Sequence, residues 1–282
     1  MTAATEQGGF DDPRFSEVHD YLGGVPRWQA LTQGSSNRLY RAHYEGRALM
    51  LRLNASPEWT PGVSRSVEAQ VLARIQGHCW APQVLHNPWR QGWCLMRDHG
   101  VPLPAVGTNG EEFMVTSLLA AIEQWQSLQG LPVEEDARLL SRYRQPLGRH
   151  PLWSDLIKRG ERVLKALPLL PRCLTHHDLH RGNLCGEQGQ WVVLDWEYAA
   201  CGNPWFDGAA LQRQFGVGVQ PIAELPAWRG LSVARCEEGL QSALWLDELL
   251  ACLWYAVRDD ACGGDENTRA RAELLLASAG PA

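Results

Sequence analysis

The residues best suited to chemistry lie in one polar loop and at the end of the strand-like run that follows it. The loop places His176, Asp178 and Asn183 in the pattern His-x-Asp-Leu-x-x-x-Asn, and Asp195 follows Asn183 after twelve residues, at the end of an apolar run. Phosphoryl transfer needs one carboxylate that orients and deprotonates the acceptor hydroxyl, and oxygen ligands that hold Mg²⁺ against the nucleotide phosphates. Asp178 is therefore the candidate catalytic residue, and Asn183 and Asp195 are the candidate metal ligands.

The other polar residues of this region are expected to support the loop. A single His-x-Asp pair is common by chance, but the complete set with a downstream amide and a strand-end carboxylate is not. His176 is expected to hold the loop, and Asp207 to brace it through backbone N–H groups. A facial triad of iron ligands would need a third histidine downstream, and His180 is the last histidine of the chain.

These motifs resemble the aminoglycoside phosphotransferase and choline kinase superfamily. Its usual loop is His-Gly-Asp-x-His-x-x-Asn, followed by a strand that ends in Asp-Trp or Asp-Phe. The stretch from Asp195 onward, Asp-Trp-Glu-Tyr-Ala-Ala-Cys-Gly-Asn-Pro-Trp-Phe-Asp, most resembles thiamine kinase and the choline/ethanolamine kinases, in which Asp-Trp/Phe-Glu-Tyr recurs. His177 departs from the pattern, because the superfamily usually has glycine there; a side chain at this position could point to solvent.

The resemblance implies a protein-kinase-like fold and a cytoplasmic enzyme that uses ATP and Mg²⁺. Arg52 stands where protein kinases have a lysine, and arginine can clamp phosphate oxygens with two N–H groups. Glu68, on the following helix, is the expected ion-pair partner of Arg52. Four residues stand where the superfamily has a glycine-rich nucleotide loop, so their backbone N–H groups are expected to approach phosphates: Gly34, Ser35, Ser36 and Asn37.

The acceptor is expected to be a small-molecule alcohol bound over the helical half of the chain, near Asp178. Choline and thiamine are cations, and aromatic faces and carboxylates stabilise cations. The aromatic candidates are Trp196, Trp205, Trp254 and Tyr255. The candidate counter-charges are Asp247, Glu248, Asp259 and Asp260, and Glu197 could also face the acceptor.

The hydrophobic pattern predicts an α+β, two-lobe architecture. Residues 1–97 are expected to form a small β-rich nucleotide-binding lobe, and residues 98–282 a larger helical lobe with the catalytic and acceptor sites. The predicted strands are 39–44, 48–53, 83–86, 93–96, 172–175 and 191–195. The predicted helices are 64–76, with Ser64 or Ser66 as its cap, 109–129, with Asn109 and Glu112 as a capping box, 153–167, 232–258 and 266–277.

Composition restricts the partners. The chain has 282 residues and a formal net charge of −6, which disfavours a nucleic-acid partner. No run of about 18 apolar residues is present, so no membrane span is expected. The N-terminus lacks the features of a secretory signal. Lys158 and Lys165 are the only lysines and neither follows a P-loop glycine pattern. The sequence leaves the oligomeric state open.

Several acceptors share this chemistry. A thiamine-kinase-like activity fits the motifs first, choline or ethanolamine second, and an aminoglycoside or amino sugar third. The competing class is a nucleotide-binding pseudokinase without turnover. Such a protein would usually have lost the catalytic carboxylate or a metal ligand, and this chain retains Asp178, Asn183 and Asp195.

Overall fold

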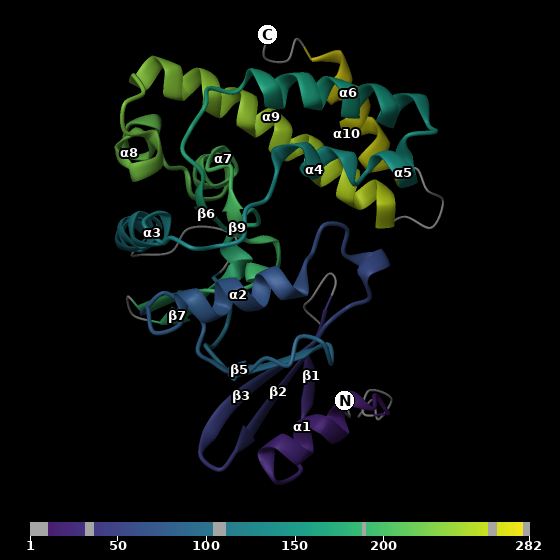
Figure 1. The fold of residues 1–282 in the computed structure, drawn as a ribbon, viewed down its shortest axis with the longest axis vertical. Helices are drawn as coiled ribbons and strands as arrows, with labels where there is room; N and C mark the ends of the chain where they lie inside the picture. Colours follow the sequence, from purple (N-terminus) through teal and green to yellow (C-terminus); the bar gives the residue numbers. More distant parts are fainter. Residues whose placement is uncertain (1–10, 32–36, 104–110, 188–189, 259–263, 279–282) are drawn as a thin grey trace, which may run out of the picture.

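The chain folds into two parts that meet along a cleft. The computed structural model describes residues 11–31, 37–103, 111–187, 190–258 and 264–278. A five-stranded antiparallel sheet forms the N-terminal part and helices dominate the C-terminal part (Figure 1). The predicted two-lobe α+β class is therefore confirmed. The predicted boundary after residue 97 lies at the last residue of strand β5.

The N-terminal sheet has the order β1-β2-β3-β5-β4. Its core comes from alternation along β3, where Leu49, Leu51 and Leu53 are all buried. Glu45 and Gly46 join β2 to β3 with φ of 48° and 74°, the two positive values that a type I′ hairpin needs. The strands are β1 (Gln29–Leu31), β2 (Arg38–Tyr44), β3 (Arg47–Leu53), β4 (Val84–His86) and β5 (Trp93–Arg97). The four strands predicted in this half are confirmed.

Two helices flank the sheet and belong to different cores. Helix α1 (Arg14–Leu22), which the sequence did not predict, packs Phe15 and Val18 with the sheet residues. Helix α2 (Arg65–Ile75) instead contributes Val71 and Ile75 to the core of the C-terminal part. It crosses the molecule between the sheet and the helical part (Figure 1), so it ties the two parts together. A short 3-10 helix, η1 (Pro57–Trp59), precedes it.

The start of α2 differs from the predicted serine cap. Ser64 occupies the N-cap position, but its side chain makes no capping hydrogen bond. Its hydroxyl lies 3.2 Å from that of Ser66. The predicted serine cap is therefore not formed.

The C-terminal part contains the four further predicted helices and several short elements. The predicted helices are confirmed as α3 (Glu111–Gln126), α6 (Pro151–Ala166), α9 (Val233–Arg258) and α10 (Glu266–Ala277). Asn109 of the predicted capping box lies outside the described residues. The unpredicted helices are α4 (Asp136–Ser141), α5 (Arg144–Leu147), α7 (Trp205–Phe215), α8 (Val219–Glu224) and the 3-10 turn η4 (Pro226–Trp228).

Short strands carry the polar loop. They pair as β6 (Cys173–Thr175) with β9 (Ala200–Gly202), and β7 (Leu184–Glu187) with β8 (Gln190–Val193). The predicted strands at 172–175 and 191–195 are confirmed as β6 and β8, although β8 ends two residues before Asp195. The loop ends in a 3-10 turn, η2 (Arg181–Asn183). A second 3-10 turn, η3 (Trp196–Tyr198), comes after β8.

The helical core is rich in tryptophan, and this corrects part of the acceptor prediction. Trp196 and Trp205 are fully buried. The indole N–H of Trp196 donates to the Val193 carbonyl at 2.8 Å, and that of Trp205 to the Pro168 carbonyl at 2.8 Å. Both were wrong as cation-binding candidates, because they are packing residues.

In the described part of the chain, no helix has the length and apolar character that crossing a membrane requires.

Candidate active site

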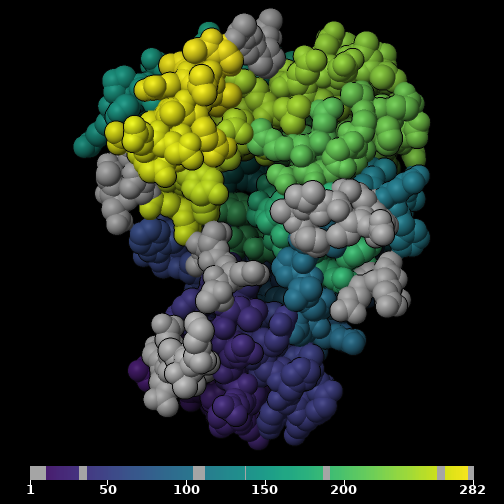
Figure 2. Space-filling view, turned by 180° about the vertical axis from the view of Figure 1, so that it is seen from behind, coloured from purple at the N-terminus to yellow at the C-terminus, as the bar shows by residue number. Residues whose placement is uncertain are grey.

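A cavity of about 1290 Å³ lies between the two parts. Leu39, Met50 and Arg52 line it from the N-terminal sheet, and Asp178 and Trp254 line it from the helical part. Figure 2 shows the surface hollowed where the C-terminal segments approach the N-terminal part. The residues of the polar loop in one part therefore face the sheet of the other part across the cavity.

Asp207 holds the polar loop at its start. It lies in the first turn of α7, is buried, and accepts the His176 N–H at 3.0 Å and the His177 N–H at 3.0 Å. Burial raises the pKa of Asp207 to about 7, while these two N–H donors act to lower it. The carboxylate thus lies where the predicted bracing role requires it.

His176 joins the loop to the strand end. Its Nε2 donates to the Leu194 carbonyl at 2.9 Å, and its Nδ1 accepts the Asp178 N–H at 3.3 Å. These two bonds fit the neutral tautomer protonated on Nε2. Burial lowers the pKa of His176 to about 3, so the ring stays neutral and serves as a fixed connector.

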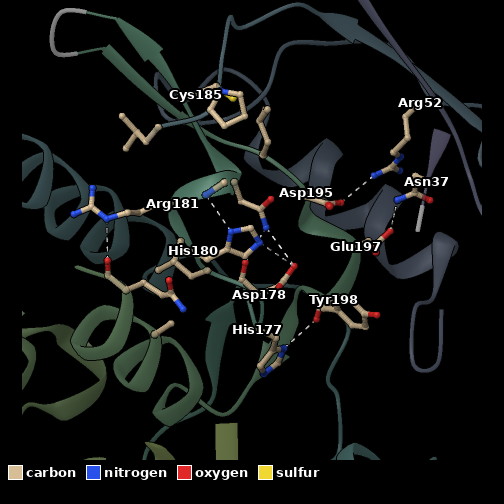
Figure 3. Close-up of a pocket in the computed structure, with 18 of the residues that line it drawn as sticks. Asn37, Arg52, His177, Asp178, His180, Arg181, Cys185, Asp195, Glu197 and Tyr198 are labelled. Carbon is tan, nitrogen blue, oxygen red and sulfur yellow. Dashed lines mark hydrogen bonds and ion pairs between the residues drawn. The ribbon is translucent and has the colours of Figure 1, made fainter. Parts of the chain in front are cut away.

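Asp178 faces the cavity (Figure 3). Asn183 donates through Nδ2 to the Asp178 carbonyl at 2.9 Å and to its Oδ2 at 3.2 Å. His180, which the sequence analysis gave no role, places Nε2 at 3.8 Å from the same oxygen. Desolvation raises the pKa of Asp178 well above its ordinary value, and the charges of Asp195 and Glu197 add to this.

Asp195 lies beside Asn183 because a backbone hydrogen bond connects its preceding residue, Leu194, to Asn183. The Leu194 N–H donates to the Asn183 carbonyl at 2.7 Å. Asp195 itself has φ of 58°, a left-handed conformation that is uncommon outside glycine. Burial and the neighbouring Glu197 raise the pKa of Asp195 to about 7, whereas Arg52 acts to lower it.

The donor set of this pair fits Mg²⁺. Asn183 uses its amide nitrogen toward Asp178, which leaves Oδ1 for a ligand. Asp195 provides a carboxylate whose side chain is 35% exposed toward the cavity. An amide oxygen and a carboxylate, with water completing the shell, suit a hard cation that retains water ligands. These two residues could therefore hold Mg²⁺ at the edge of the cavity.

Arg52 forms the centre of a buried charge cluster. Its Nη1 lies 2.6 Å from Glu68 Oε1 and 3.5 Å from Asp195 Oδ1, and its Nε donates to Asn54 Oδ1 at 3.0 Å. Its Nη2 is buried and has no hydrogen-bond partner within the described residues. An orphaned buried N–H donor at a cavity wall is suited to an anionic ligand such as a phosphate oxygen.

The structure describes one residue of the predicted nucleotide loop, Asn37. Gly34, Ser35 and Ser36 lie outside the described residues. Asn37, directly before β2, accepts the Ala55 N–H at 3.0 Å through Oδ1. Its side-chain amide donates to Glu197 Oε2 at 2.8 Å.

Arg65 was missed by the sequence analysis, although it joins the same cluster. It contacts Glu197 at 2.8 Å, Glu68 at 3.0 Å and Asn37 Oδ1 at 2.9 Å. Glu197 is buried and its carboxylate is committed to Asn37 and Arg65, on the side of the N-terminal sheet. The available signal in the sequence was a cation at the first position of a helix, where the helix dipole disfavours it.

The remaining acceptor candidates lie along α9. Trp254 and Tyr255 both line the cavity. Trp254 donates its indole N–H to the hydroxyl of Tyr198 at 3.2 Å, and the Arg258 guanidinium lies 4.3 Å from its ring centroid. Asp247 lines the cavity too, but pairs with Arg213 at 2.8 Å.

The other predicted counter-charges are placed less favourably or are not described. Glu248 is committed to two arginines, Arg213 at 3.0 Å and Arg271. It does not line the cavity. Asp259 and Asp260 lie outside the described residues.

His177 does not point to solvent, which corrects the expectation for this position. Its side chain is buried, and its Nδ1 donates to the Tyr198 carbonyl at 3.0 Å. Burial lowers the pKa of His177 to about 4. Its φ is 63°, so it retains the left-handed backbone that a glycine would adopt there. Space for the ring comes from Gly202, where an added Cβ would lie 2.2 Å from His177 Cε1.

We expect Gly202→Ala to destabilise the protein by about 1–3 kcal/mol, because the new methyl group overlaps the buried imidazole. The double variant His177→Gly/Gly202→Ala should recover most of this loss, because the overlap is then removed. Urea denaturation measures both. Gly218→Ala is the control, because φ is −68° there and the nearest atom to a new Cβ lies at 3.9 Å. Equal losses in the single and double variants would contradict the steric explanation.

Comparisons with known proteins agree with this geometry. No curated protein matches the chain in sequence. Among solved structures, choline kinase LicA from Streptococcus pneumoniae superposes with a TM-score of 0.68 at 14% identity, covering 93% of this chain and 95% of that one. Macrolide 2'-phosphotransferase MphH from Brachybacterium faecium gives 0.60 at 22% identity, covering 94% and 98%. An aminoglycoside phosphotransferase solved with ADP and hygromycin B gives 0.63 at 15% identity, covering 93% and 97%.

These likenesses confirm the predicted protein-kinase-like fold of the superfamily. The sequence profile of the phosphotransferase enzyme family matches residues 27–243. This match includes the polar loop, Arg52, the strand-end Asp195 and the first part of α9, up to residue 243. Because it spans well over half of the chain, the protein belongs to the phosphotransferase enzyme family.

Proposed function

We propose that this protein transfers the γ-phosphoryl group of ATP to a hydroxyl of a small molecule, with Asp178 as the catalytic base. The observation that carries the proposal is the placement of the Asp178 carboxylate. It faces the cavity, beside Asn183 and on a loop whose backbone Asp207 fixes. A base must stand where the acceptor hydroxyl can reach it, and a carboxylate at the cavity wall supports this role for Asp178.

The transfer would be direct and in line. The acceptor oxygen forms a bond to the γ-phosphorus as the bond to the leaving ADP breaks, and the hydroxyl proton passes to Asp178. Arg52 would hold phosphate oxygens through its unpartnered Nη2. Asn183 and Asp195 would hold Mg²⁺, which when bound neutralises charge on the nucleotide phosphates. His176 and Asp207 would keep the loop in place.

A cationic acceptor fits the wall of the cavity next to Asp178. Tyr198, Trp254 and Tyr255 supply aromatic surface there, and Asp247 supplies a carboxylate. Within the proposal, a thiamine-kinase-like acceptor comes first because the Asp-Trp-Glu-Tyr stretch resembles that group. Choline or ethanolamine comes second, which agrees with the choline kinase likeness. Aminoglycosides or amino sugars come third, which agrees with the structure solved with ADP and hygromycin B.

The test is ADP release in a coupled assay with ATP and Mg²⁺. The panel contains thiamine, choline, ethanolamine, kanamycin and N-acetyl amino sugars. One strongly preferred acceptor supports the proposal and identifies the acceptor class. Silence across the panel with Mg²⁺-dependent ATP binding intact would overturn the proposed acceptor classes alone.

A thermal-shift titration with ATP separates an enzyme from a nucleotide-binding pseudokinase. A shift that requires Mg²⁺ supports the kinase proposal, because Asn183 and Asp195 are then engaged. A shift of the same size without Mg²⁺, together with silence in the assay, favours the pseudokinase. Absence of any shift, together with silence in the assay, would overturn ATP as the donor.

We expect Trp254→Ala to raise the KM for a cationic acceptor by roughly 2- to 30-fold, which corresponds to the loss of about 0.5–2 kcal/mol of cation–π attraction. The KM for ATP serves as the internal control, because Trp254 lies on α9 with the acceptor candidates. Steady-state kinetics with each substrate varied in turn gives both constants. Parallel rises in both would contradict a specific acceptor role.

A further inference from the structure

The first residue of α2 is an unusual place for a buried cation. Arg65 begins the helix, and its side chain is only 15% exposed. The N-terminus of a helix carries partial positive charge, so an arginine there is disfavoured. A buried arginine in this position needs compensating partners, and they come from three separate segments.

Those partners join both parts of the molecule. Arg65 Nη1 lies 2.8 Å from Glu197 Oε2, on η3 of the C-terminal part, and 3.0 Å from Glu68 Oε2 on its own helix. Arg65 Nη2 donates to Asn37 Oδ1 at 2.9 Å. Asn37 closes the ring by donating to the same Glu197 oxygen at 2.8 Å. Figure 3 shows Asn37 and Glu197 facing each other beside Asp195 and Arg52.

We propose that Arg65 is a positioning residue for the nucleotide, and this inference rests on the proposed function. Arg65 holds Asn37, the last residue of the predicted phosphate loop, against Glu197. Glu197 lies two residues after Asp195, so the same contacts fix the spacing between Asn37 and the predicted metal ligand. Glu197 therefore acts as the anchor of an interlobe latch, formed by Asn37, Arg65 and Glu197, and does not contact the acceptor.

The charge balance of the cluster explains why the latch depends on Arg65. Glu197 is buried, and its described partners are the Asn37 amide and Arg65. Removing one partner of a buried ion pair leaves the other charge uncompensated. Glu68 is less dependent, because Arg52 also contacts it at 2.6 Å. Loss of Arg65 should therefore release Glu197 and Asn37 while the Arg52–Glu68 pair persists.

The experiment compares Arg65→Met with Arg65→Lys, and with Arg74→Met as the matched control on the same helix. Arg74 is exposed, and the hydrogen bond that its side chain makes to the described residues is to the Gln129 carbonyl, at 3.1 Å. Titration calorimetry with ADP and Mg²⁺ gives nucleotide affinity, and kinetics with the acceptor found in the panel gives KM and kcat. We expect Arg65→Met to weaken ADP binding and raise the KM for ATP by about tenfold or more, the effect of losing charged hydrogen bonds.

The pattern of the two Michaelis constants distinguishes positioning from simple structural support. The KM for the acceptor should change by less than about twofold, since an effect of 0.4 kcal/mol is near the noise of such measurements. Arg65→Lys should recover part of the nucleotide affinity, because lysine keeps the charge but not the two-pronged geometry. Equal changes in both KM values, or no change in either, would overturn the inference.

A second variant covers the case in which Arg65→Met does not fold. Asn37→Ala keeps the Arg65–Glu197 ion pair and removes the contacts of the Asn37 side chain with Arg65, Glu197 and the Ala55 N–H. It should raise the KM for ATP and weaken ADP binding while the melting temperature stays within a few degrees of the wild type. Unchanged nucleotide affinity in this folded variant would overturn the inference. If the wild-type protein itself binds neither ATP nor ADP, the proposed function is overturned, and the latch with it.

Discussion

Asp178→Asn is expected to leave a folded protein whose kcat is lower by roughly 10²–10⁴-fold, the usual contribution of general base catalysis. The amide keeps the shape of the side chain and the contact with Asn183, but it cannot accept the hydroxyl proton. The same variant should melt at a higher temperature than the wild type when no nucleotide or metal is added. Coupled ADP release and differential scanning calorimetry measure the two effects.

The expected gain in stability follows from the raised pKa of Asp178. A carboxyl whose pKa is raised in the folded state favours folding only while it is protonated. This contribution is lost as the pH rises through the folded-state pKa. Above the ordinary aspartate pKa the carboxyl therefore opposes folding, because the unfolded state releases its proton more readily than the folded state, and a neutral amide removes this penalty. The difference in melting temperature should vanish at about pH 3, below the ordinary aspartate pKa.

Asp155→Asn is the matched control for this experiment. Asp155 is exposed on α6 and pairs with Lys158 at 3.3 Å, so its removal should change neither kcat nor the melting temperature appreciably. Substantial turnover in Asp178→Asn would remove Asp178 from its catalytic role. A melting temperature of Asp178→Asn below that of the wild type would contradict the explanation that the charge of Asp178 destabilises the folded protein.

Arg52→Met is expected to destabilise the protein by about 3–5 kcal/mol, because it breaks a buried ion pair from one side. Glu68 would keep Arg65 as a partner, but Asp195 would lose its only described cationic contact. Binding of ATP should also be lost, since the orphaned Nη2 disappears. Urea denaturation and calorimetric titration with ATP and Mg²⁺ measure the two consequences.

Two comparisons make the Arg52 experiment specific. Arg47→Met removes an exposed ion pair from the same strand and should cost only about 0–1 kcal/mol. The double variant Arg52→Met/Glu68→Gln should be less destabilised than Arg52→Met alone, because neither charge is then buried without its partner. A loss for Arg52→Met no larger than that for Arg47→Met would show that the buried cluster contributes little to folding.

The local part of the site could be predicted from the sequence because it is encoded by spacing along the chain. Asp178, Asn183 and Asp195 lie within 18 residues of one another, and one loop and one short hairpin bring them together. The long strands and helices were predictable for the same reason, since β3 and α9 carry repeating apolar positions. Short elements such as α4, α5 and β9 contain too few residues for any periodicity to emerge.

Long-range pairings were not predictable from one sequence. Arg65 and Glu197 are 132 residues apart, and no local pattern connects them. The side chain of His177 was wrongly expected to point to solvent, because the space for its ring is provided by Gly202 on strand β9. Trp196 and Trp205 could not be told from binding residues by type alone. Each of the thirteen tryptophans could have been a core residue or a binding residue. Only the packing separates the buried rings from the ring of Trp254 at the cavity.

The guanidinium of Arg52 has a practical consequence for chemical profiling. Acylating nucleotide probes react with a lysine amine beside the phosphates. They do not react with an arginine there, because a neutral amine is nucleophilic and a guanidinium group is not. Here the charged group on β3 is an arginine, and both lysines of the chain lie exposed on α6. Such a probe would therefore label this protein only outside the cleft, and a screen that recognises nucleotide sites by lysine acylation would overlook it.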